Sequence, residues 1–173
     1  MLFDKDAFFE KILPQLLAAV VGAVAAIGTH LWLKPQEYQI IKIFDDRREA
    51  AKEVERGFTK FLADFNEYRN LMLARSSIDL SDSTAVAAFN ARFDIIYGHF
   101  KESIRELSHS LNIAGTFFGS ETADEISKFR NWYNAQDARM QEARVTAQDW
   151  PTLNDCLGWK NRIREKIKAE LGV

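Results

Sequence analysis

The stretch AKEVERGFTKFLADFNEYRNLM, residues 51–72, decides the fold of this chain. Its apolar residues recur at alternating steps of three and four: Ala51, Val54, Phe58, Phe61, Phe65, Tyr68 and Met72. This spacing is typical of a heptad seam, in which one face of an α-helix packs against other helices. Gly57 is the only helix breaker between residues 36 and 76. The pattern therefore predicts one long helix over residues 35–76.

Toward the N-terminus the same seam continues through Ile40 and Phe44, and only Arg47 interrupts it. A helix of this length would measure about 60 Å at roughly 1.5 Å per residue, which is more than the other helices of the chain can cover. Charged residues crowd positions 45–49. We therefore expect residues 36–57 to form a stalk.

Residues 12–33 contain no Asp, Glu, Lys or Arg. A helix of about 22 residues spans roughly 33 Å, close to the thickness of the hydrocarbon core of a bilayer. Trp32 lies where an interfacial aromatic residue would lie. These features predict a single transmembrane helix over residues 12–33, after a flank of residues 1–11. A cleaved signal peptide and a buried core helix are the alternatives, but the flank lacks a basic excess and the domain is small.

The orientation follows from the Lys and Arg residues around that segment. Lys5 and Lys11 precede it, and Lys34, Lys42, Arg47 and Arg48 follow it. The positive-inside rule then predicts a single-pass protein of the inner membrane, with the domain of residues 34–173 in the cytoplasm. The single cysteine fits a reducing compartment and excludes an intramolecular disulfide.

Small residues recur every four positions within the predicted span, at Ala18, Gly22 and Ala26. Small side chains allow helix backbones to approach closely in lipid, where packing drives association. We therefore predict a homo-oligomer that assembles through this stripe. The alternative is that alanine and glycine are simply common in membrane helices.

Three further amphipathic helices are predicted after the long one. The first begins at a cap formed by Ser81, Asp82 or Ser83 and ends near Ala114, with Gly115 in the left-handed cap position. The next begins at Thr122 and Glu125, which have capping-box spacing, and the last runs from a cap at Thr152 to Gly172. Four amphipathic helices with short connections favour an all-α fold, an antiparallel four-helix bundle.

Residues that carry chemistry are scarce in the sequence. It contains no glycine-rich phosphate loop, no nucleophile elbow and no zinc-protease motif. Glu106 and His109 have the spacing of a di-iron ligand pair, but the second such pair that these sites need is missing. Cys156 lies beside Leu157 on an apolar helix face and is expected to be a small buried residue. We therefore predict no metal, no cofactor and no enzymatic activity.

The last helix has a basic face, and we take Lys160, Arg162, Arg164, Trp159 and Trp132 as candidate ligand-binding residues. Cations interleaved with aromatic rings are able to bind an anionic ligand such as a nucleotide. A solvated surface and contact with anionic lipid headgroups are the two alternatives. The net charge is close to zero, so double-stranded nucleic acid is not an expected partner.

The anchor, the stalk and the basic, aromatic C-terminal half together resemble small membrane effectors of bacterial antiviral signalling. These include the cyclic-oligoadenylate-activated membrane proteins of type III CRISPR systems. The resemblance implies a cyclic nucleotide ligand and a membrane that is disturbed on activation, but it assigns no residue. The residues themselves favour a membrane-anchored, non-enzymatic oligomeric module that binds a cytosolic ligand or a protein partner. An enzyme with an unrecognised site in the bundle is the remaining alternative.

Overall fold

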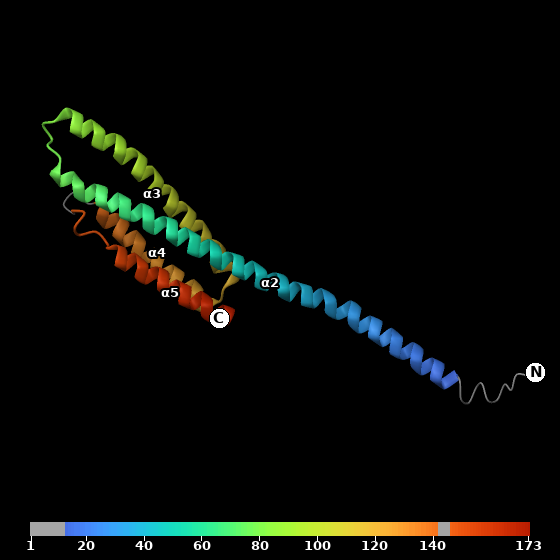
Figure 1. Ribbon diagram of the computed structural model, residues 1–173. Coiled ribbons are helices and arrows are strands. Elements are labelled where there is room, and N and C mark those ends of the chain that lie inside the picture. Colours follow the sequence, from blue (N-terminus) through green and yellow to red (C-terminus); the bar gives the residue numbers. More distant parts are fainter. Residues whose placement is uncertain (1–12, 142–145) are drawn as a thin grey trace, which may run out of the picture. The chain divides into compact units, whose positions relative to one another are not determined.

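The computed structural model describes residues 13–141 and 146–173, which are all-helical apart from their connections (Figure 1). The helices are α2 (Leu13–Ala74), α3 (Ser83–Phe117), α4 (Ser120–Met140) and α5 (Leu153–Leu171), and a 3-10 turn, η2 (Arg75–Ser77), follows α2. The chain divides into two compact units: the first ends at Phe44 and the second comprises Asp45–Val173. The predicted all-helical class is confirmed.

The second unit is a bundle in which the C-terminal part of α2 and all of α3, α4 and α5 run side by side in alternating directions (Figure 1). Its core includes Phe58, Phe61 and Phe65 of the predicted seam of α2. The other helices contribute Phe100, Leu107 and Leu111 of α3, Ile126 and Phe129 of α4, and Cys156, Ile163 and Ile167 of α5. Aromatic rings join the helices: the centroids of Phe58 and Phe129 are 5.3 Å apart and those of Phe65 and Phe100 are 5.8 Å apart. Burial of these large side chains is the main source of the bundle's stability.

The predicted transmembrane helix is wrong. Within residues 13–141 and 146–173, no helix combines the length and the apolarity needed to cross a membrane. Residue 12 of the predicted span lies outside the described residues, and the rest belongs to α2. This finding covers the described residues, and several side chains of the predicted span, including those of residues 13–17 and 29–33, lie outside them. The predicted single-pass location in the inner membrane and the cytoplasmic orientation depended on this span and are withdrawn with it.

Part of the predicted stalk, residues 36–57, belongs to the packed core. Ala50 and Val54 are buried. Arg47, which interrupts the seam, has a structural role, since its Nε donates a hydrogen bond to the carbonyl oxygen of Phe117 at 2.8 Å. A cation near the C-terminus of a helix pairs with carbonyl groups that lack helical partners. Arg47 therefore fastens the end of α3 to α2.

The connection between α3 and α4 also differs from the prediction. α3 continues past Gly115 to Phe117, and Gly172 is the only described residue with a positive φ. α4 begins after Gly119 without a cap from a neighbouring side chain. In place of the predicted capping box, Glu170 of α5 accepts hydrogen bonds from the Gly119 N–H at 2.5 Å and from the Thr122 hydroxyl at 2.7 Å. By contrast, the predicted caps at Asp82 and Thr152 are present.

The hydrogen bonds that Glu170 accepts from Gly119 and Thr122 make its carboxylate a pH-dependent cap of α4. Partial burial raises the pKa of Glu170, but the hydrogen bonds from Gly119 and Thr122 and the nearby Arg47 outweigh it and hold the pKa below its ordinary value. A carboxyl group whose pKa is lower in the folded state stabilises the fold above its unfolded pKa, and this contribution is lost as the pH falls through the folded pKa.

Replacing Glu170 with glutamine is therefore expected to lower the free energy of unfolding at neutral pH by about 0.5–2 kcal/mol, the usual range for loss of a helix cap. The difference from the wild type should shrink at acidic pH, as the pH falls through the lowered pKa of Glu170 and its carboxyl group becomes protonated. Urea denaturation at neutral and at acidic pH measures it. Glu165→Gln, on the same helix and 63% exposed at its side chain, is the matched control and should have little effect at either pH.

Candidate ligand-binding pocket

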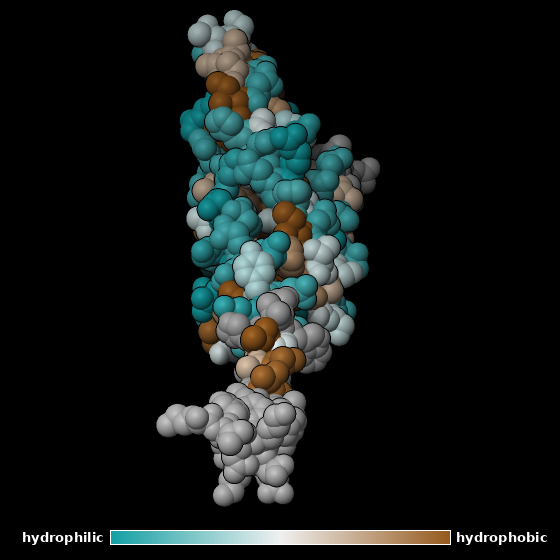
Figure 2. Space-filling view, turned by 90° about the vertical axis from the view of Figure 1, so that its right-hand side faces the viewer, coloured by the Kyte–Doolittle hydropathy of each residue, from teal (hydrophilic) through white to brown (hydrophobic). Residues whose placement is uncertain are grey.

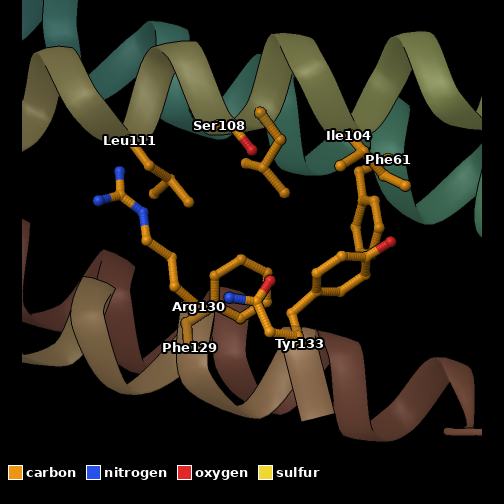
Figure 3. Close-up of a pocket in the computed structure, with 9 residues that line it drawn as sticks. Phe61, Ile104, Ser108, Leu111, Phe129, Arg130 and Tyr133 are labelled. Carbon is orange, nitrogen blue, oxygen red and sulfur yellow. The ribbon is translucent and has the colours of Figure 1, made fainter. Parts of the chain in front are cut away.

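A pocket of about 170 Å³ opens between α2, α3 and α4 in the bundle (Figure 3). Its lining residues are Phe61, Ile104, Leu107, Ser108, Leu111, Phe129, Arg130, Tyr133 and Asn134. Most of the lining is aliphatic or aromatic, and three of its residues carry polar groups that reach solvent. An apolar cavity of roughly 150 Å³ is known to hold a benzene ring. This pocket is therefore large enough for one ring or a short branched chain.

Helical spacing brings the lining residues together. Ile104, Leu107 and Leu111 lie at steps of three and four on α3 and so share one face. Phe129 and Tyr133 lie four residues apart on α4. Figure 3 shows these two faces opposite each other, with Phe61 of α2 at one end of the space between them. Phe61 is buried, and its ring meets that of Tyr133 edge-on with centroids 5.9 Å apart.

Arg130 gives the pocket its positive charge. Its guanidinium group extends from α4 toward Leu111 (Figure 3) and donates a hydrogen bond to the side-chain oxygen of Asn112 at 2.6 Å. That partner is neutral, and Arg130 forms no ion pair with any carboxylate of residues 13–141 or 146–173. Ser108 and Asn134 are exposed at the same site. The pocket thus combines apolar walls with one unpaired cation, a hydroxyl and an amide.

Tyr133 contributes a buried phenol. Its hydroxyl has no hydrogen-bond partner in the described part of the chain, although it is shielded from solvent. Burial raises the pKa of Tyr133 well above its ordinary value, and the charge of Asp137 raises it further. The group therefore stays protonated, and it can donate a hydrogen bond but cannot act as a base near neutral pH.

The structure brings together part of the basic face predicted on α5. The guanidinium group of Arg162 lies over the ring of Trp159, 3.6 Å from its centroid. The rings of Trp159 and Trp132 are 5.8 Å apart. Such an arrangement is able to stabilise the fold by cation–π and aromatic contacts without any ligand.

The cations of that face are engaged with carboxylates. The ammonium group of Lys160 lies 2.5 Å from Glu55, and its side chain is only 14% exposed. The remaining two form looser pairs, Arg162 with Glu125 at 3.3 Å and Arg164 with Glu165 at 3.7 Å. An anionic ligand at this face would have to compete with these carboxylates. Arg130 was not among the predicted site residues, because its lack of a carboxylate partner is a property of the tertiary structure.

The other sequence candidates lie apart from the pocket. Ala18 is exposed, a Cβ atom added at Gly22 would meet nothing within 4 Å, and the side chain of Ala26 lies outside the described residues. Glu106 pairs with Lys60 at 2.6 Å. No group of three or more His, Cys, Asp or Glu residues in the described ranges is placed to hold a metal ion.

Cys156 is buried, as predicted, and burial raises the pKa of its thiol to about 12. A thiol in this environment is protonated and inert near neutral pH. It is therefore a core residue of α5.

Comparison with known proteins identified no relative: no protein-family model, no curated protein and no solved structure matches this chain. The resemblance to membrane effectors of antiviral signalling therefore stays a prediction. Any function must be inferred from the pocket and the surface themselves.

Proposed function

We propose that this protein is a non-enzymatic helical module that binds a small anionic ligand with an apolar body in the pocket between α2, α3 and α4. The observation that carries this proposal is a guanidinium group without a carboxylate partner beside apolar walls. A ring or short branched chain fits against Phe61, Leu107 and Phe129. A carboxylate on the same ligand is then able to form paired hydrogen bonds with Arg130.

The chemistry of the lining favours binding over catalysis. Ser108 has no histidine or carboxylate beside it in the lining that would activate it as a nucleophile. Tyr133 keeps its proton because of burial. The lining therefore offers shape, apolar contact and one charge, which together are sufficient for recognition.

Benzoate is a suitable probe, because it joins one ring to one carboxylate. We expect the full chain to bind benzoate, and Arg130→Ala to weaken this binding about tenfold or more, since a hydrogen bond to a charged group contributes about 1.5–3 kcal/mol. A titration followed by NMR reports both the affinity and the site, because signals of Phe61 and Tyr133 should shift.

The matched control is Arg105→Ala. Arg105 lies on α3 outside the pocket, and its side chain is 78% exposed and paired with Glu102. Removing this charge should leave benzoate binding unchanged. Equal binding by the wild type and Arg130→Ala, or shifts confined to residues outside the pocket, would contradict the proposal.

The predicted nucleotide ligand can be tested in the same titration. Arg162 lies over the ring of Trp159, and Trp132 lies beside that ring at an interplanar angle of 42°, so the group offers aromatic surface to which a base could add. If a cyclic oligoadenylate shifts the signals of these residues and leaves those of Phe61 and Tyr133 unchanged, the nucleotide-binding alternative is favoured over the pocket.

A further inference from the structure

Large apolar side chains of α2 in the first unit are exposed to solvent. Val20, Val24, Ile27, Tyr38 and Ile41 are each 58% to 69% exposed, and Val21, Ile40 and Ile43, on other faces of the helix, are 54% to 68% exposed. Figure 2 shows brown, hydrophobic patches at several heights of a face that is otherwise largely hydrophilic. A row of exposed apolar residues on one helix marks an interaction surface, because a helix without packing partners is only marginally stable in water.

The spacing of these residues indicates what covers them. Val20, Val24 and Ile27 follow one another at steps of four and three, and Lys34, Tyr38 and Ile41 repeat the same steps fourteen residues later. Fourteen residues are two heptads, so both groups lie on one seam of the helix, about 33 Å long at roughly 1.5 Å per residue. We call these six residues the α2 seam.

We propose that the α2 seam packs against the same seam of another copy of this chain, with the helices parallel and in register. A heptad seam fits a second seam of the same period, because its side chains insert into the spaces of the facing helix. The α2 seam and its copy have equal length and period by definition. Self-association therefore covers Val20, Val24, Ile27, Tyr38 and Ile41, the apolar residues of the α2 seam.

Charges beside the α2 seam select the parallel arrangement. Glu37 and Lys42 flank the seam on opposite sides, at the positions named g and e in a heptad. Both are exposed, and neither forms an ion pair within the described part of its own chain. In a parallel, in-register pair the g residue of one helix faces the e residue five positions later in the other. Glu37 of each copy then faces Lys42 of the other, whereas an antiparallel pair separates them.

Lys34 is the one charged residue of the α2 seam. A single lysine at a core position fixes register and subunit number at some cost in stability, and its long side chain can carry the ammonium group to solvent. Gly22 lies on the opposite side of the helix, at the outermost heptad position. The small-residue stripe Ala18, Gly22 and Ala26 therefore faces away from the proposed interface.

Charge reversal tests the proposal in the full chain. Glu37→Lys places like charges opposite Lys42, and Lys42→Glu places like charges opposite Glu37. Each variant alone should dissociate at about tenfold higher concentration than the wild type at low salt, since two exposed pairs change from attraction to repulsion. An equimolar mixture of the two variants should regain wild-type association, because every facing pair in the mixed assembly is again attractive. Analytical ultracentrifugation measures the association constants.

Three controls separate this interface from other causes. Glu49→Lys and Lys52→Glu make the same exchange at an exposed pair in the second unit and should have no effect. Gly22→Leu should also leave association unchanged. Arg130→Ala should not alter it either, so failure of the ligand pocket and failure of this interface are distinguishable. Circular dichroism establishes that each variant keeps its helix content.

Three results would overturn the proposal. One is a wild-type chain that stays monomeric at high micromolar concentration. Another is a mixture of Glu37→Lys and Lys42→Glu that associates no better than either variant. The third is dissociation by Gly22→Leu without any effect of Glu37→Lys, which would assign the interface to the small-residue stripe.

Discussion

Phe61→Ala is expected to lower the free energy of unfolding by about 3–5 kcal/mol, the usual range for removing a buried phenylalanine side chain. Phe61 is 1% exposed. Its ring contacts three others, those of Phe65 at 5.8 Å, Phe100 at 6.1 Å and Tyr133 at 5.9 Å. These rings belong to α2, α3 and α4, so the substitution leaves a void where three helices meet. Urea denaturation followed by circular dichroism measures the loss.

Leu80→Ala is the control for this prediction. Leu80 is 81% exposed. Removal of a surface side chain of this kind usually changes stability by less than about 0.5 kcal/mol. A Phe61→Ala variant that unfolds at the same urea concentration as Leu80→Ala would show that the aromatic cluster does not hold the bundle together.

Gly57→Leu is expected to destabilise the bundle by about 1–3 kcal/mol, as overpacking of a helix contact usually does. A Cβ atom at Gly57 would lie 2.8 Å from the hydroxyl oxygen of Ser110 and 3.3 Å from the Cα atom of Leu107. The second of these atoms is backbone, so α3 itself would have to move. Glycine here permits the close approach of α2 and α3, although glycine within a helix costs about 1 kcal/mol relative to alanine.

Gly98→Leu is the matched control, because Gly98 is also a helical glycine but an added Cβ atom there meets nothing within 4 Å. Leucine is the better helix former, so this variant should be more stable than the wild type by up to about 1 kcal/mol. Thermal denaturation of the two variants should therefore give shifts of opposite sign. Stabilisation by both substitutions would show that the contact at Gly57 is loose.

The helical class and most of the bundle core could be predicted from the sequence. Apolar periodicity reports which face of a helix is buried, whatever covers that face. Phe58, Phe61 and Phe65 were placed on one seam by their spacing, and all three are buried in the structure. Caps made by adjacent residues were predictable for the same reason, since Thr152 and Asp155 need only each other.

Features that depend on distant residues could not be predicted. Gly115 is a residue type that often ends a helix, but α3 continues to Phe117. Arg47 donates a hydrogen bond to the carbonyl oxygen of Phe117. Thr122 has capping-box spacing with Glu125, but it binds Glu170 of another helix. Local motifs therefore marked helix ends correctly only where no tertiary contact competed.

The transmembrane prediction depended on the absence of charge in residues 12–33 and on the length of that run. It is wrong because no helix of the described residues has the length and apolarity needed to cross a membrane. The candidate site was missed because the sequence shows which residues carry charge but not which charges are neutralised. Lys160 lies against Glu55, whereas Arg130 meets only the amide of Asn112.

The burial of the single cysteine gives the bundle a built-in reporter of its own motion. Cys156 is 1% exposed, and the chain contains no other cysteine whose thiol could react with the reagent. An alkylating reagent can reach the sulfur atom only in molecules whose α5 has separated from its neighbours. The alkylation rate of Cys156 in the wild-type chain therefore reports how often α5 separates from the other helices. A ligand that stabilises the bundle should lower this rate.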